Sequence, residues 1–154
     1  LGDVYKRQIE YNVRMGDPEC QAILPRLKTD LVKIIISAVS NKLKNIKIKW
    51  SQNKSMTIVL CSKGYPGNYK KKIRIINLDK INKLKNSFIY HAGTKLENQQ
   101  LLSNGGRVLN FTSIGKSFIV IRKNIIKLIK KLNWKHGFYR KDIGWKVINK
   151  NAYH

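Results

Sequence analysis

Met56-Thr57-Ile58-Val59-Leu60-Cys61 is a short, continuous apolar run, and the turn residues Gly64-Tyr65-Pro66-Gly67 follow it closely. A run of this length bounded by turn residues is typical of a buried β-strand. Residues 107–114 are a second strand candidate, rich in Val, Leu, Phe and Ile, and the turn signal Asn104-Gly105-Gly106 stands immediately before them. The two segments are therefore predicted to be β-strands.

Helical periodicity occurs on both sides of these strands. A helix that begins at Ser117 is predicted to bury one apolar face made of Ile121, Ile125, Leu128, Ile129 and Leu132. An earlier helix is predicted with Thr29 as its cap, Asp30 in its first turn and apolar residues at helical spacing up to Val39. Further strands are predicted at 73–76, 88–91 and 144–148. Strands with a helix laid against them predict an α+β fold.

The length of 154 residues fits one domain, or a small domain plus part of another. A polar, irregular stretch at 45–55 predicts the boundary between residues 9–45 and residues 55–150. Residues 1–8, Leu-Gly-Asp-Val-Tyr-Lys-Arg-Gln, resemble a translated sequencing-adapter sequence, so we treat them as a non-native scar. No apolar run approaches the roughly 18 residues of a membrane span, and no secretory signal is visible. With only two cysteines, a reduced, cytoplasmic setting is expected.

The net charge of +24 suggests nucleic acid as a partner at first sight. The chain has 25 Lys but only 7 Arg, together with 21 Ile and 15 Asn, and these are the residues whose codons an AT-rich genome enriches. The lysines are also spread along the chain, whereas a nucleic-acid binder gathers its charge on one face. Codon drift therefore explains the charge better, and a small basic RNA-binding or ribosome-associated protein is kept as the alternative.

Acidic residues are scarce, yet Glu10, Asp17 and Glu19 fall within ten positions of one another, with Asn12 among them. Carboxylate and amide oxygens are the ligands that Mg²⁺ prefers. On a strand, Glu10 and Asn12 point to the same face. A polar turn with a capped helix start at Asp17-Pro18-Glu19 explains the same residues without a metal, and both interpretations stay open at this point.

The segment from Glu10 to Gln21, EYNVRMGDPECQ, resembles the signature of the phosphoribosylamine–glycine ligase family near the end of its ATP-grasp domain. The resemblance continues, in the family's order, through Gly64-Tyr65-Pro66-Gly67, His91-Ala92-Gly93-Thr94-Lys95, Asn104-Gly105-Gly106-Arg107-Val108-Leu109 and Tyr139-Arg140-Lys141-Asp142-Ile143-Gly144-Trp145. It covers about residues 9–150. The family's amino-terminal domain and most of its ATP-grasp domain have no counterpart, so the resemblance implies a C-terminal fragment that is inactive alone.

The resemblance also implies roles for particular residues. Members of the family join glycine to 5-phosphoribosylamine through glycyl phosphate, with ATP as co-substrate. Glu10 and Asn12 correspond to ligands of Mg²⁺ or Mn²⁺ at the ATP phosphates. Arg14 is expected to steady phosphate oxygens, and Asp17 is a weaker candidate for holding the substrate amine. A different ATP-grasp ligase that acts on a neighbouring metabolite is a further alternative, against which the close fit of residues 14–21 argues.

Arg107 and Lys95 are candidate ligands for the 5′-phosphate of phosphoribosylamine. Arg107 is one of the few arginines and follows a turn at the start of a strand, so a rigid element can aim its planar fork. Lys95 precedes the same turn. Related ATP-grasp enzymes of purine synthesis use a Lys and an Arg of this domain to hold a ribose phosphate. The resemblance to them is loose, because the spacing of the two residues differs. A salt bridge between Arg107 and an acid such as Asp142 is the structural alternative.

Overall fold

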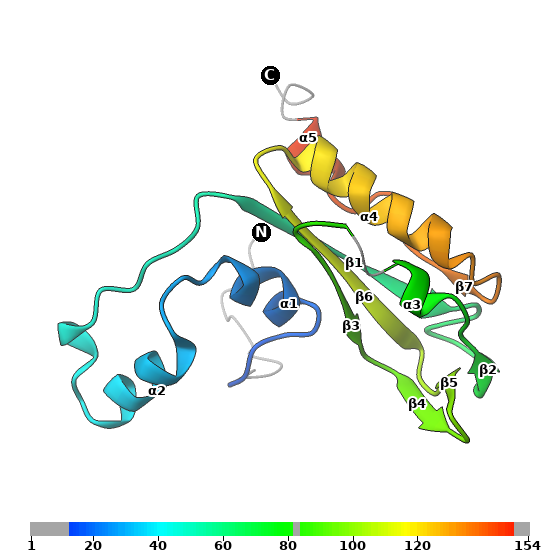
Figure 1. The fold of residues 1–154 in the computed structure, drawn as a ribbon, viewed down its shortest axis with the longest axis horizontal. Coiled ribbons are helices and arrows are strands. Elements are labelled where there is room, and N and C mark those ends of the chain that lie inside the picture. The colour runs from blue at the N-terminus through cyan, green and yellow to red at the C-terminus, as the bar shows by residue number, and fades with distance from the viewer. Residues whose placement is uncertain (1–12, 82–83, 150–154) are drawn as a thin grey trace, which may run out of the picture.

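The computed structural model describes residues 13–81 and 84–149, and its fold is α+β, as predicted (Figure 1). An antiparallel sheet has the strand order β3-β6-β1-β7. Its strands are β1 (Lys54–Ser62), β3 (Ser87–His91), β6 (Arg107–Gly115) and β7 (Gly137–Phe138). A smaller antiparallel sheet has the order β2-β5-β4, formed by β2 (Ile73–Arg74), β4 (Thr94–Glu97) and β5 (Gln100–Ser103).

The helices are short, with one exception. They are α1 (Glu19–Ile23), α2 (Leu31–Val39), α3 (Leu78–Ile81), α4 (Phe118–Leu132) and α5 (Trp145–Ile148), and 3₁₀ turns lie at Leu24–Arg26 and Leu43–Asn45. Figure 1 shows α4 running along one face of the larger sheet, with α1 on the other side. In the part of the chain that the structure describes, no helix is both long and apolar enough to cross a membrane.

The pairing of β1 with β6 forms the centre of the larger sheet. It runs antiparallel from Lys54 opposite Gly115 to Leu60 opposite Leu109, and a register shift follows between Leu60 and Cys61. Along β1, buried residues alternate with half-buried ones, as expected for a strand whose two faces meet different surroundings. In β6, by contrast, six consecutive residues are buried, so side chains on both faces of this strand are covered.

Helix α4 covers one face of this sheet with the five residues predicted from periodicity. Ile121, Ile125, Leu128, Ile129 and Leu132 are all buried, and Lys123, Lys127 and Lys130 on the opposite side are exposed. The helix ends at Asn133, whose φ of 50° is left-handed and whose backbone N–H donates to the Ile129 carbonyl at 3.3 Å. The core cluster is thus formed by α4 with inward residues of β1 and β6, including Ile58, Leu109 and Phe111.

Three local predictions need correction. The strand expected at 144–148 is instead helix α5 (Trp145–Ile148): its N-cap residue Gly144 has a φ of 83°, and the N–H of Ile148 donates to the Gly144 carbonyl at 3.2 Å. The cap of α2 is Asp30 rather than Thr29, because Asp30 Oδ1 accepts from the N–H of Lys33. The strand expected at 73–76 contains only Ile73 and Arg74.

The β4–β5 hairpin was not predicted. Its turn residues Asn98 and Gln99 both have positive φ angles, 48° and 59°, which is the geometry of a two-residue hairpin turn. Asn is common there but Gln is not, and glycine is absent, so the usual signal is missing from the sequence.

Replacement of Ile125, which is 0% exposed, by Ala is expected to lower the free energy of unfolding by about 2–5 kcal/mol through lost burial and a residual cavity. Ile119→Ala on the outer side of the same helix, where the side chain is 61% exposed, is the matched control, with an expected change within about 0.5 kcal/mol. Denaturant unfolding of both variants measures the difference. Equal losses of unfolding free energy in the two variants would show that α4 does not pack against the sheet through the face that carries Ile125.

Candidate functional site

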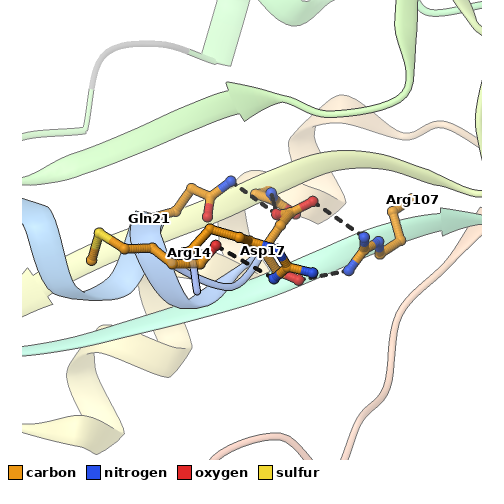
Figure 2. A network of polar contacts seen from close by, with 6 residues as sticks. Arg14, Asp17, Gln21 and Arg107 are labelled. Atoms are coloured by element: carbon orange, nitrogen blue, oxygen red, sulfur yellow. Dashed lines mark hydrogen bonds and ion pairs between the residues drawn. The ribbon is translucent and has the colours of Figure 1, made fainter. Parts of the chain in front are cut away.

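A network of polar contacts joins the N-terminal loop to the central strand β6 (Figure 2). Asn110 Nδ2 donates to Asp17 Oδ1 at 2.8 Å, and Arg107 Nη1 donates to the Asp17 carbonyl at 2.6 Å. Arg107 Nη2 also lies 3.5 Å from Asp17 Oδ2 as an ion pair. Gln21 Nε2 donates to Asp17 Oδ1 at 2.9 Å. Asp17 is therefore held from two sides, by Gln21 of α1 and by β6.

The loop before α1 is ordered by contacts within itself. Glu19 Oε2 accepts from the N–H of Gly16 at 3.0 Å, and the N–H of Cys20 donates to the Gly16 carbonyl at 2.8 Å. The helix start considered at Asp17-Pro18-Glu19 is present, but no side chain caps it: the residue at the N-cap of α1 is Pro18. Arg14 is exposed, and its Nη1 donates to the carbonyl of Met15 at 3.5 Å.

Beside this network lies a hollow of about 370 Å³, which we call the arginine hollow. Its wall is mostly apolar and contains two guanidinium groups. The lining residues are Pro18, Thr57, Val59, Cys61, Tyr65, Pro66, Arg107, Phe138, Arg140 and Ile143. The hollow therefore combines segments from four places in the chain: the N-terminal loop, β1 with the turn after it, the start of β6, and the C-terminal segment.

Each guanidinium of the arginine hollow has a carboxylate partner. Arg107 has Asp17, and Arg140 donates from Nε and Nη2 to the two carboxylate oxygens of Asp142, at 3.1 and 2.5 Å. The hydrogen bonds from Arg140 hold the pKa of Asp142 below its ordinary value. A carboxylate that fixes the plane of a guanidinium orients its remaining N–H donors, and this arrangement is suited to binding an anion.

The segment that carries Arg140 is fastened to α4 by another arginine. Arg122 Nε donates to the Ile143 carbonyl at 3.0 Å, and its Nη2 donates to the carbonyl of Lys141. These contacts hold residues on both sides of Asp142, so the position of Arg140 relative to the sheet is set by α4.

The turn before Arg107 requires glycine because two backbones approach closely. The N–H groups of Asn104 and Gly105 both donate to the Gly93 carbonyl, at 2.7 and 3.0 Å, and a Cβ on Gly93 would lie 2.6 Å from the Gly105 Cα. A Cβ on Gly106 would overlap the ring of Tyr65. The turn predicted at 104–106 therefore places Tyr65 and Arg107 at the same edge of the arginine hollow.

Lys95 is not brought into the arginine hollow. It lies on β4, where its Nζ is 3.5 Å from Glu97 Oε2, and it is not among the lining residues. The salt bridge considered as the structural alternative for Arg107 is present, but its acid is Asp17 rather than Asp142, which pairs with Arg140. Sequence reasoning gave Arg140 and Asn110 no role. The scarcity of arginine was the available signal for Arg140, and a polar residue within an apolar strand was the signal for Asn110.

The predicted metal ligands Glu10 and Asn12 lie outside the described residues. Among residues 13–81 and 84–149 there is no group of three or more His, Cys, Asp or Glu side chains placed to hold a metal ion. In the described part of the loop, the carboxylates of Asp17 and Glu19 are both engaged by protein donors. The described residues therefore do not form a metal site by themselves, and the role of Glu10 and Asn12 stays a prediction.

Comparison with known proteins agrees with the α+β architecture. Residues 55–146 match the family described as "Phosphoribosylglycinamide synthetase, C domain". The chain belongs to this family.

Relatives named phosphoribosylamine–glycine ligase include proteins of Fusobacterium nucleatum, 44% identical over 144 residues, and Agrobacterium fabrum, 41% identical over 140 residues. These matches cover 93% and 91% of this chain and 33% of each relative. The crystal structure of the phosphoribosylamine–glycine ligase of Thermotoga maritima superposes with a TM-score of 0.64 at 27% identity, over 87% of this chain and 32% of that one. The chain thus spans about a third of the length of these relatives.

The contact between Asn110 and Asp17 is expected to stabilise the fold, because it is a hydrogen bond from a buried amide to a carboxylate. A double-mutant cycle of Asp17→Ala and Asn110→Ala should give a coupling free energy of about 1.5–3 kcal/mol in denaturant unfolding. The same cycle with Thr112→Ala, whose hydroxyl pairs with Thr57 at 2.7 Å, should give less than about 0.5 kcal/mol. A coupling free energy near zero between Asp17 and Asn110 would show that their contact does not hold the N-terminal loop on β6.

Burial raises the pKa of the Cys61 thiol, and the nearby Arg107 guanidinium opposes this shift. In a Cys20→Ser background, the midpoint of the pH profile for alkylation of Cys61 by iodoacetamide should therefore lie above about 8.5, the ordinary thiol value. Arg107→Ala should move this midpoint further upward, since the charge that favours the thiolate is removed. An unchanged midpoint would show that Arg107 is too far from Cys61 to act on its pKa.

Proposed function

We propose that the chain is the C-terminal part of a phosphoribosylamine–glycine ligase. This enzyme joins glycine to 5-phosphoribosylamine, with ATP as co-substrate, in purine biosynthesis. The observation that supports the proposal most strongly is the match of residues 55–146 to the C domain family, together with relatives of this name at about 40% identity. Since the chain spans a third of these relatives, we propose further that it does not turn over ATP alone.

The arginine hollow is the proposed binding place for the phosphate of phosphoribosylamine. A guanidinium has five N–H donors, and the contacts of Arg107 with Asp17 use only part of that fork. Its side chain is 42% exposed, so a ligand can reach the rest. Arg140 lines the same hollow and is a second candidate. Lys95 stays a proposed phosphate ligand only if the Lys95–Glu97 ion pair opens.

The N-terminal loop has proposed roles at the ATP phosphates. Arg14 is exposed and donates only a long hydrogen bond, to the Met15 carbonyl at 3.5 Å, so its guanidinium is proposed to bind phosphate oxygens. Mg²⁺ or Mn²⁺ is proposed at Glu10 and Asn12. A metal there would neutralise phosphate charge. For Asp17 the described contacts support a different function from holding the substrate amine. They support a positioning role, in which Asp17 orients Arg107 and ties the loop to β6.

A chimera tests the proposed function. This chain replaces the matching third of the Fusobacterium nucleatum ligase, to which it is 44% identical. The chimera is expected to form ADP in a glycine- and phosphoribosylamine-dependent reaction, whereas the isolated chain gives no turnover above a blank without enzyme. A well-folded chimera without activity, or activity of the chain alone, would contradict the proposal.

Within the chimera, Arg107→Ala should raise KM for phosphoribosylamine about tenfold or more, the effect of losing a charge-assisted hydrogen bond, and leave KM for ATP nearly unchanged. Arg74→Ala, at an exposed position of β2 that does not line the arginine hollow, is the matched control. If both constants stay within about twofold while the melting temperature falls, Arg107 serves only to hold Asp17.

A further inference from the structure

A second hollow, which we call the lysine basin, lies at the end of β1 and has a volume of about 530 Å³. This volume falls within the range of small-molecule sites, about 300–1,000 Å³, and the wall is mostly apolar. The lining includes Lys63, Asn68, Tyr69, Lys70, Ile73 and His136. None of the lining residues of the lysine basin belongs to the arginine hollow. The lysine basin is therefore a separate candidate for a binding site.

Hydrogen bonds to neighbouring strands set the walls of the lysine basin. The N–H of Lys63 donates to the His136 carbonyl at 2.9 Å, which joins the end of β1 to the residue before β7. The N–H of Lys72 donates to the Ser103 carbonyl at 2.6 Å, and the N–H of Ile73 donates to Ser103 Oγ at 3.2 Å. These two contacts join the start of β2 to β5. Each wall is thus held by a sheet.

Aromatic contacts hold two of the rings that line the lysine basin. Trp134 packs edge-on against His136 with the ring centroids 6.3 Å apart, and its Nε1 donates to the Arg74 carbonyl at 3.0 Å. Tyr69 packs edge-on against Tyr65 at 6.1 Å. Tyr65 lines the arginine hollow, so each hollow receives one ring of this pair. A flat ligand can stack on a ring that is already held, because little further ordering of the protein is needed.

The cations of the lysine basin have no carboxylate beside them. In the part of the chain that the structure describes, the ion pairs of lysine run from Lys72 and Lys95 to Glu97, and none involves Lys63 or Lys70. No Asp or Glu stands among the described residues that line the basin. Lysine ammonium groups are common phosphate ligands and act there as point charges. The basin is therefore suited to an anion.

We propose that the lysine basin binds a nucleoside phosphate, with its phosphate held by Lys63 and Lys70 and its base against Tyr69 and Ile73. The amide of Asn68 has both donors and an acceptor, so it can pair with the edge of a base. Inorganic phosphate alone would leave most of the volume and the apolar wall empty. The nucleoside phosphate can be a free nucleotide or one unit of an RNA strand. The proposal goes beyond the proposed function and does not depend on it.

Titration calorimetry of the 154-residue chain with AMP at about 0.15 M salt tests the proposal. We expect one AMP per chain, with a dissociation constant of about 1 mM or lower. Lys63→Ala combined with Lys70→Ala should raise this constant about tenfold or more, because charge-assisted hydrogen bonds to phosphate are lost. Lys127→Ala combined with Lys131→Ala removes the same charge from exposed positions of α4 and is the matched control, with an expected change within about twofold.

Further measurements locate the base and distinguish the two sources of the nucleotide. Tyr69→Leu should weaken AMP binding about tenfold through lost stacking, and should leave the binding of inorganic phosphate within about twofold. Arg107→Ala should leave AMP binding within about twofold, because Arg107 lines the other hollow. Single-stranded hexaadenylate that binds more than about tenfold tighter than AMP, with the same dependence on Lys63 and Lys70, would assign the nucleoside phosphate to an RNA strand.

Several outcomes would overturn the proposal. Equal weakening in the two double-lysine variants would show that AMP is attracted only by the net charge. No detectable binding of AMP at about 10 mM, or unchanged AMP binding in Tyr69→Leu, would reject the nucleoside phosphate as the ligand. Loss of AMP binding in Arg107→Ala would place the nucleotide in the arginine hollow. Because Lys63 and Lys70 are exposed, their double variant should keep its melting temperature within about 2 °C of wild type. An inactive chimera would reject the proposed function and leave these binding results unaffected.

Discussion

The rest of the structure depends on one constraint, which is that β6 must be covered on both of its faces. From Val108 to Ser113 this strand is completely buried. Helix α4 covers one face with an apolar stripe. The other face carries Asn110 and Thr112, and a buried polar side chain is unfavourable without a hydrogen-bond partner. Thr112 finds one in Thr57 on the neighbouring strand, and Asn110 finds one in Asp17, which lies 93 positions away. The N-terminal loop is therefore required by the chemistry of the sheet.

The same requirement assembles the candidate site. Once Asp17 is held over β6, it also orients Arg107, and the turn before Arg107 brings the ring of Tyr65 to the same edge. The C-terminal segment then adds Arg140, at a position set by the contacts of Arg122 with backbone carbonyls. The arginine hollow is thus built from distant segments that are connected by hydrogen bonds.

Arginine and lysine have different uses in this chain. Arg26, Arg107 and Arg122 each donate to a backbone carbonyl at least 19 positions away, so they connect separate segments. The ion pairs of lysine in the described residues, from Lys72 and Lys95, both go to Glu97, and these lysines are more than half exposed. The planar guanidinium of arginine can hold a fixed partner, whereas an ion pair of a flexible lysine ammonium at the surface contributes little to stability. The high net charge therefore says less about function than the few arginines do.

The amino-acid sequence by itself determined the α+β class, the central strands and the buried face of α4, because these depend on the spacing of apolar residues within one element. It also carried the motifs by which the family was identified. It did not determine that a helix, α5, forms where a strand was predicted, that Asp17 is the partner of Arg107, or that Lys95 lies outside the arginine hollow. Those outcomes were decided by the tertiary structure, because each depends on which distant segments meet, and local spacing contains no information about contacts some 90 positions apart.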